Sequence, residues 1–259
     1  MSASTEADGL LGQASQLIDE ARRLLSASAT SDKAKTIDSS PSGPPSFFEM
    51  PEFFDPIRQH LFGGKLIQDQ VDGIKSISAL CVDIGLCIEQ TAYVLASCYH
   101  ESAHTMQPVR ETLSGSDEQA IARLEHAWRN GKLPWVEEPY WRKDAAGKSW
   151  FGRGLIQITH EENYDKQQRK LADHPRRESA VPYQVHDEPD IALHPQTALL
   201  IAVLGMADGD FTGHKLADHI RPGMADYTTA RRIVNGTDRA GQIAGYARIF
   251  ERAIREAYE

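Results

Sequence analysis

The sequence predicts a mostly α-helical fold with a small β-hairpin element, preceded by a separate N-terminal helix and a linker. Apolar residues recur at three- and four-residue intervals through most of residues 47–259, whereas the alternation typical of a strand is confined to residues 150–159. A stretch rich in Ser and Pro separates this region from the first residues. With 259 residues, 41% of them hydrophobic, the chain can bury one sizeable core. We therefore expect one domain at 47–259, after an N-terminal segment at 1–46.

The N-terminal segment combines a helix with a linker. Residues 8–26 place Leu and other apolar side chains on one stripe of an amphipathic helix, which suits docking or tethering. The stretch that follows ends in PSGPP (41–45), where fixed φ angles and missing amide donors discourage regular structure. The domain is therefore expected to begin near Phe47.

Five helices are expected within the domain. The first two cover residues 68–80 and 90–100, where apolar side chains follow the helical period. The third begins at Ser116, which has the capping-box spacing to Gln119, and ends at Gly131. The last two cover residues 195–208 and 240–257. Between the third and the fourth, residues 150–159 predict a short strand or hairpin.

Composition and charge narrow the class of function. A formal charge of -9 and the lack of a Lys/Arg run argue against a nucleic-acid partner. The arginines near the C-terminus are interpreted as a solvated helix face, and they are Arg231, Arg232, Arg239, Arg248, Arg252 and Arg255. The cysteines lie in apolar, helix-like sequence without metal-ligand spacing and are expected to be small buried side chains: Cys81, Cys87 and Cys98.

Targeting and membrane segments are not expected. The N-terminus lacks a basic region followed by an apolar one, and no run approaches the roughly 18 apolar residues of a membrane span. We therefore expect cytoplasmic synthesis without a signal peptide and without a membrane span. If the substrate lies outside the cell, another device must carry the protein there.

Glu101, at the end of the apolar run, fits two chemistries. The sequence HESAH (100–104) satisfies HExxH, in which two histidines one helical turn apart hold zinc and the glutamate activates its water. Alternatively, Glu101 is the acid of a glycosidase, with the helix dipole and the neighbouring Tyr99 and Met106 raising its pKa. An isolated glutamate at such a position is by default a surface residue in the last turn of a helix.

Glu111 is the candidate second carboxylate. Glycosidic bonds are usually broken by a pair of carboxyl groups, one acting as an acid and one as a base or nucleophile. Glu111 follows Glu101 after a Pro-interrupted stretch that can fold back across a cleft. The alternative is a loop glutamate paired with Arg110, while Glu118 and Glu125 are weaker candidates for the same role.

The sequence WFGRGLIQIT (150–159) is the second informative stretch. Two glycines flank Arg153, and alternation places Gln157 and Thr159 on one face. A polar face beside a cleft can bind the hydroxyl and acetamide groups of a sugar. Asn163 adds an amide to this face, and Tyr164 adds an aromatic platform. A glycine-flanked hairpin needs no ligand, so this pattern alone does not establish binding.

Several motifs, taken in order along residues 47–259, resemble the family 19 glycoside hydrolases, with the closest likeness to their phage-endolysin and bacterial branch. These motifs are HE (100–101), PVRE (108–111), FGRG followed by QIT (151–159), NY (163–164) and ARRIVNG (230–236). The resemblance implies a lysozyme-like α+β fold that hydrolyses β-1,4 bonds of N-acetylated glycans with inversion, without a metal or organic cofactor. It implies Glu101 as the catalytic acid and Glu111, less securely, as the second carboxylate. The glycan-binding residues that it implies are Arg153, Gln157, Thr159, Asn163, Tyr164 and Asn235.

The likeness also has departures. The sequence SAH (102–104) stands where the family often has Thr-Gly-Gly, and residues 112–150 form an insertion rich in aromatic residues, which serve either as sugar platforms or as packing. Peptidoglycan is the expected substrate, and chitin stays open. We expect a monomer whose partner is a glycan polymer, and which reaches the cell wall through a holin, through lysis or through a secretion system.

Three alternatives remain open beside the glycosidase. A zinc peptidase needs a third ligand. The metzincin extension fails because Gln107 and Arg110 stand where it requires Gly and His, which leaves a glutamate such as Glu125 as the third ligand. A lytic transglycosylase needs only Glu101, and an inactive glycan-binding protein of the same fold needs neither acid. The presence of both Glu101 and Glu111 argues against loss of activity.

Overall fold

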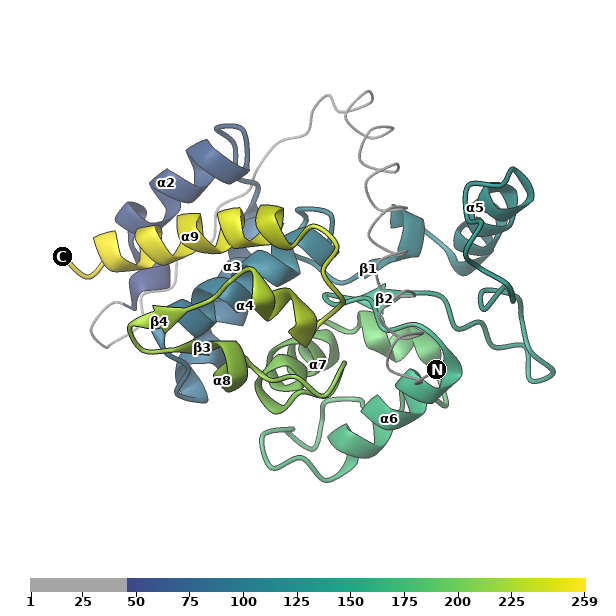
Figure 1. The fold of residues 1–259 in the computed structure, drawn as a ribbon. Coiled ribbons are helices and arrows are strands. Elements are labelled where there is room, and N and C mark those ends of the chain that lie inside the picture. The colour runs from purple at the N-terminus through teal and green to yellow at the C-terminus, as the bar shows by residue number, and fades with distance from the viewer. Residues whose placement is uncertain (1–45) are drawn as a thin grey trace.

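The computed structural model describes residues 46–259, and within them the fold is mostly helical (Figure 1). Eight α-helices and two small two-stranded antiparallel sheets make up the described part of the chain. The predicted class, mostly α with a small β element, is thereby confirmed. The predicted helix at 8–26 and nearly all of the linker lie outside the described residues.

The two strands of the first sheet lie far apart in the sequence. The helices are α2 (Pro51–Leu61), α3 (Gln68–Asp83), α4 (Ile88–Glu101), α5 (Asp117–Arg129), α6 (Glu161–Ala172), α7 (Pro195–Asp208), α8 (Leu216–His219) and α9 (Ala240–Glu256). Short 3₁₀ helices are η1 (Phe47–Glu49), η2 (Glu111–Leu113), η3 (Pro189–Leu193) and η4 (Thr229–Ile233). The sheets pair β1 (Val109–Arg110) with β2 (Arg153–Gly154), and β3 (Ile220–Arg221) with β4 (Met224–Ala225).

Helix α4 is the centre of the domain. All its residues from Thr91 to Glu101 are buried, as expected for a helix that neighbours enclose on all sides. Helix α9 runs along it, with α2 on the outer side of α9 (Figure 1). The buried face of α9 is rich in alanine, and such small side chains allow two helix backbones to approach closely. The last residue of α4, Glu101, is therefore held inside the molecule.

The predicted helices are confirmed with small shifts at their ends. Those expected at 68–80, 90–100, 195–208 and 240–257 correspond to α3, α4, α7 and α9. The helix expected from Ser116 is α5, and Ser116 Oγ accepts a hydrogen bond from the Gln119 backbone N at 3.3 Å. The Gln119 side chain accepts from the backbone N of Gly115 and not from that of Ser116, so the reciprocal bond of the capping box moves by one residue.

Helices α2 and α6 were not among the predicted elements. In α6 only Tyr164, Gln167 and Leu171 are buried, which leaves too few apolar side chains to reveal the helical period. Helix α2 contains Pro56 in its interior, and a proline there normally argues against a helix.

The predicted hairpin at 150–159 forms only in part. Strand β2 pairs with the distant β1, in a register that sets Arg110 opposite Arg153, while Arg153 and Ile158 make an isolated bridge within the stretch itself. The pairing brings Glu111 beside Gly152, because the backbone N of Glu111 donates to the Gly152 carbonyl at 2.7 Å. The sheet therefore joins two motifs that are far apart in sequence.

The insertion at 112–150 has a small core of its own. Leu124 and Ala127 of α5 pack there with Trp141 and Phe151, and Figure 1 shows α5 standing away from the bundle of α4 and α9. Trp128 also packs against this core, and its Nε1 donates to the Val136 carbonyl at 2.9 Å. The aromatic residues of the insertion therefore include packing residues.

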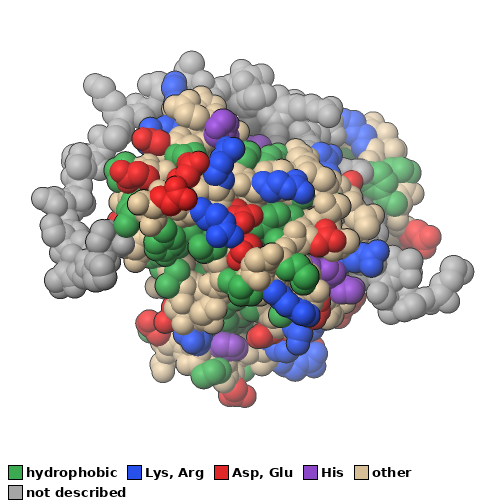
Figure 2. Space-filling model, turned by 60° about the vertical axis from the view of Figure 1, so that its left-hand side comes forward, with side chains coloured by type: hydrophobic (Ala, Val, Ile, Leu, Met, Phe, Trp, Pro, Cys, Tyr) green, Lys and Arg blue, Asp and Glu red, His purple; other side chains and the backbone are tan. Residues whose placement is uncertain are grey.

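The surface carries mixed charges, and two of the three cysteines are buried as expected. On the face in Figure 2, basic and acidic side chains are interspersed and form no extended basic patch. Cys81 and Cys98 are buried and Cys87 is half-buried, all as free thiols. Among residues 46–259, no helix has the length and apolar character needed to cross a membrane.

Candidate active site

Glu101 closes helix α4 and forms a buried ion pair with Arg231. Its Oε1 accepts from Arg231 Nη1 at 2.7 Å, and the two side chains are 2% and 0% exposed. Arg231 lies on η4, and its Nε donates to the Asp238 carbonyl at 3.1 Å. The interpretation of Arg231 as part of a solvated face is therefore wrong. A buried charge is tolerated when an opposite charge compensates it, and Glu101 supplies that charge.

The backbone turns sharply directly after Glu101. Ala103, His104 and Met106 have φ values of 53°, 68° and 56°, a region that costs non-glycine residues on the order of 1–3 kcal/mol each. Helix α3 anchors this turn, because Gln70 Nε2 donates to the His104 carbonyl at 3.0 Å. A Cβ on Gly73 would lie 2.0 Å from the Met106 carbonyl oxygen, so only glycine permits this approach. The position of Glu101 is thus set by α3 as well as by α4.

The same turn removes the helical geometry that HExxH requires. Helix α4 ends at Glu101, so His100 and His104 do not occupy successive turns of one helix. The His104 ring instead stacks on Tyr99, with ring centroids 4.0 Å apart. In the part of the chain that the structure describes, no group of three His, Cys, Asp or Glu side chains is placed to hold a metal ion.

Asn235 and Arg231 together present two buried donors without protein partners in residues 46–259. Asn235 is 1% exposed, its backbone N donates to the Arg231 carbonyl at 2.9 Å, and its Oδ1 accepts from Gly236 N at 2.7 Å. Its Nδ2 and the Nη2 of Arg231 make no hydrogen bond there. A buried donor left unsatisfied is costly, so these two groups mark a place where a ligand oxygen would be favourable.

Glu111 is fully enclosed, yet no ion pair reaches it within the described residues. Its Oε1 accepts from the Tyr140 hydroxyl at 2.8 Å, and its Oε2 accepts from the Gly152 backbone N at 2.7 Å. Burial raises the pKa of Glu111, and the two hydrogen bonds and the nearby Arg153 oppose that rise without cancelling it. Glu111 is therefore a carboxyl group held by neutral donors in an environment that penalises its charge.

Gln157 lies against Glu111 across Gly152. A Cβ on Gly152 would meet Gln157 Oε1 at 2.7 Å and Glu111 Oε2 at 3.3 Å, so the absence of a side chain there allows both groups to approach. Gln157 Nε2 donates to the carbonyls of Val109 and Gly154 at 3.1 and 2.9 Å. Its buried Oε1 accepts no hydrogen bond from the described residues. The structure thus places Gln157 in the Glu111 cluster.

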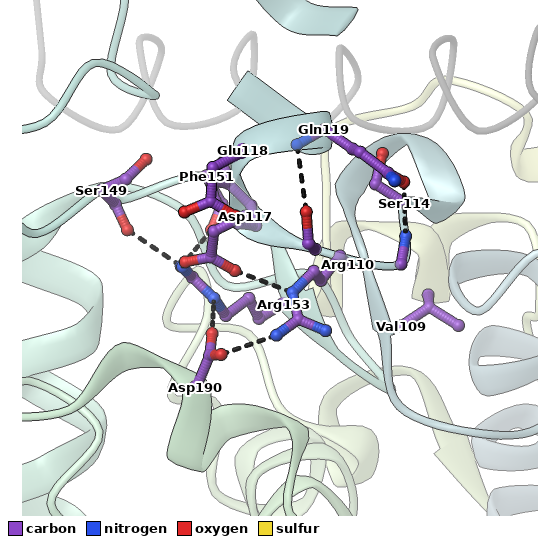
Figure 3. A network of polar contacts seen from close by, with 12 residues as sticks. Val109, Arg110, Ser114, Asp117, Glu118, Gln119, Ser149, Phe151, Arg153 and Asp190 are labelled. Atoms are coloured by element: carbon purple, nitrogen blue, oxygen red, sulfur yellow. Dashed lines mark hydrogen bonds and ion pairs between the residues drawn. The ribbon is translucent and has the colours of Figure 1, made fainter. Parts of the chain in front are cut away.

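Arg153 is the centre of a network that Figure 3 shows from close by. Its Nε donates to Asp190 Oδ1 at 2.8 Å and its Nη2 to Asp117 Oδ2 at 2.5 Å, and Arg110 bridges the same two aspartates from the neighbouring strand. Its Nη1 donates to the Ser149 carbonyl at 2.9 Å. Because protein groups already meet the guanidinium from three sides, the structure shows Arg153 holding the strands, the insertion and η3 together.

The remaining predicted residues lie on or just before α6. The Tyr164 hydroxyl donates to the Phe151 carbonyl at 2.7 Å and accepts from Arg153, and the whole side chain is buried. Asn163 Nδ2 donates to the Thr159 carbonyl at 2.8 Å, and Thr159 is itself buried. The hydrogen bonds of Tyr164 and Asn163 therefore support the backbone of residues 150–159, in which Thr159 lies.

The predicted site residues therefore form two groups, around Glu101 and around Glu111. The first contains Asn235, and the second contains Gln157, with Arg153 adjoining it. Sequence reasoning did not assign Tyr140 or Arg231 as contacts of the carboxylates. Tyr140 was visible only as one aromatic among several in the insertion, and nothing in the spacing pairs Arg231 with a residue 130 positions earlier.

Comparison with protein families, curated proteins and solved structures gave no match for this chain.

Proposed function

We propose that the protein is a glycoside hydrolase that cleaves β-1,4 bonds of N-acetylated glycans, with peptidoglycan as the first candidate and chitin as the second. The motif resemblance to family 19 supports this function, together with the mostly helical fold and two buried carboxyl groups in different environments. In this proposal Glu101 donates a proton to the leaving sugar oxygen, and Glu111 activates water on the opposite face of the ring. The proposed partner is the glycan polymer alone, and a monomer suffices.

The environment of Glu111 is the observation that carries the proposal. A carboxyl group that is 0% exposed and has no ion pair within residues 46–259 destabilises the fold, so packing alone does not account for it. Such groups are concentrated at catalytic sites, where a raised pKa makes a carboxylate a stronger proton acceptor. Tyr140 and Gly152 fix the orientation of both carboxylate oxygens.

The residues around the two carboxyl groups have complementary tasks. Arg231 orients Glu101 through their buried ion pair. The free Nδ2 of Asn235 and the free Oε1 of Gln157 are an unused donor and an unused acceptor, which suit the acetamide and hydroxyl groups of a sugar. The strand motif is held in place by Arg153, Thr159, Asn163 and Tyr164. In the proposal these residues support the site and do not contact the glycan directly.

Glu111 must become accessible for the reaction to proceed. Tyr140 comes from the insertion, whose small core is separate from the main one, and its hydroxyl closes over Glu111 Oε1. Thr112 and Leu113, directly after Glu111, have φ values of 64° and 53°, so the insertion joins the strand through strained backbone. We infer that the insertion moves away at this joint when substrate and water enter.

One observation favours a second assignment with the same two residues. The raised pKa of Glu111 also suits a proton donor, and the buried ion pair with Arg231 suits Glu101 as the base. In this reversed mechanism Glu111 is the acid and Glu101 is the base. An aryl glycoside with a good leaving group distinguishes the two assignments, because the variant that lacks the acid keeps its activity on such a substrate.

The proposal is tested by incubating wild type, Glu101→Gln and Glu111→Gln with peptidoglycan and with chitin oligomers, in the presence and absence of EDTA. Mass spectrometry of the products is expected to find EDTA-resistant release of reducing-end sugars, lost in both variants. Anhydro sugars that persist in Glu111→Gln would indicate a lytic transglycosylase. Peptide cleavage that EDTA abolishes would replace the proposal with a zinc peptidase.

The place of action follows from the same proposal. A wall hydrolase made in the cytoplasm meets its polymer after release through a holin, through lysis or through a secretion system. Fractionation of the producing cells, with activity measured in each fraction, tests this step.

A further inference from the structure

A charged cavity lies beside strands β1 and β2, close in sequence to Glu111. Its volume is about 410 Å³, and Arg110, Asp117, Arg153 and Asp190 form its floor, where the network of Figure 3 is centred. Arg110 ends β1 and lines the cavity, whereas the next residue, Glu111, begins η2 and is held by Tyr140 and Gly152. The cavity and the Glu111 cluster are therefore connected through adjacent residues of the chain.

Ion pairs cross-link the residues that form the floor of the cavity. Arg153 is 1% exposed and is bound to both aspartates, while Arg110 donates to Asp117 at 2.7 Å and to Asp190 at 2.6 Å. Four charged groups that neutralise one another leave little net charge on the floor.

The rim of the cavity offers charges of both signs for a ligand. Lys143 is 52% exposed and lies 3.8 Å from Glu118, which is 75% exposed, so this pair is loose. Glu188 also belongs to the lining and is exposed. The lining includes no aromatic side chain, and therefore lacks the flat platform on which sugar rings stack.

We infer that this cavity binds the charged stem peptide of peptidoglycan, with Lys143 contacting a carboxylate and Glu118 and Glu188 contacting an ammonium group. The lining contains four basic and four acidic side chains, which matches a ligand carrying both charges better than a neutral glycan or a polyanion. Chitin has no such branch. The inference rests on the proposed function and decides its substrate, because it predicts a preference for peptidoglycan.

The test compares hydrolysis of intact peptidoglycan with hydrolysis of the same glycan strands after an amidase has removed the stem peptides. Wild type is expected to have the higher kcat/KM on the intact polymer. The double variant Lys143→Ala/Glu118→Ala is expected to lose about three- to tenfold on intact polymer, as for two exposed charge contacts, and nothing on stripped strands. Arg169→Ala, which removes an exposed i,i+4 pair with Asp165 outside the cavity lining, is the matched control and is expected to change neither.

Titration of wild type and the double variant with the free stem peptide, followed by NMR, measures peptide binding to the cavity without any hydrolysis. Binding by wild type that is weakened in the double variant supports the inference, even if no polymer is cleaved and the proposed function fails. Hydrolysis of both polymers at equal rates, with no peptide binding at millimolar concentration, would overturn the inference and leave the proposed function standing. Peptide binding that the double variant retains would also overturn it.

Discussion

Replacement of Arg231 by Met tests whether Glu101 depends on a buried ion pair. The two side chains are 0% and 2% exposed, and their charged atoms are 2.7 Å apart. Removing one partner of such a pair leaves a buried charge uncompensated, which typically costs about 3–5 kcal/mol. For a domain of this size each kcal/mol lowers Tm by about 2–4 °C, so Arg231→Met is expected to lower Tm by about 6–20 °C.

Urea and thermal unfolding followed by circular dichroism measure this effect against two comparisons. Arg169→Met breaks an ion pair whose side chains are 72% and 38% exposed, and is expected to cost less than about 1 kcal/mol. Adding Glu101→Gln to Arg231→Met removes the unpaired charge and is expected to restore part of the stability. If Arg231→Met costs no more than Arg169→Met, or if Glu101→Gln restores nothing, the described role of the pair is wrong.

Three further predictions concern the Glu111 cluster. Tyr140→Phe removes a hydrogen bond that lowers the pKa of Glu111, so the acid limb of the kcat/KM–pH profile is expected to move to higher pH, and an unmoved limb would contradict the contact. Because burial raises the pKa of Glu111 in the folded state, wild type loses stability as the pH rises from the ordinary carboxyl range through that raised pKa. Glu111→Gln is expected to remove this loss in urea unfolding between about pH 4 and pH 8, and an unchanged pH dependence would count against it. Gly152→Ala brings a methyl group to 2.7 Å from Gln157 Oε1, so hydrolysis is expected to fall sharply with the helical circular dichroism spectrum retained, whereas wild-type activity would refute the close approach.

The helices were predictable where the hydrophobic period is strong. Helix α7 has the residue range expected, because apolar side chains and a proline at its start define it locally. The polar helix α6 was missed because few of its side chains are buried, and Tyr164 and Leu171 pack in one core cluster with Trp150, a contact that no local pattern reveals.

The candidate carboxylates were predictable from motif order, but their partners were not. The Glu101–Arg231 pair joins α4 to η4, and the Tyr140–Glu111 contact depends on how the insertion folds back. Such pairs are products of tertiary structure, since residues 29 and 130 positions apart share no periodicity. The same reason explains why Arg153 was expected to contact glycan, while the structure encloses it between Asp117 and Asp190.

The anomeric configuration of the first product tests the proposed mechanism most directly. Proton NMR recorded during the first minutes of hydrolysis, before mutarotation, reads the new reducing end of glycan strands or chitin oligomers. Water activated on the face opposite to the leaving oxygen gives the α-anomer, which is the predicted result for the two carboxyl groups acting as acid and base. A β-anomer, or no reducing end at all, would contradict the assignment of Glu101 and Glu111 as an inverting pair.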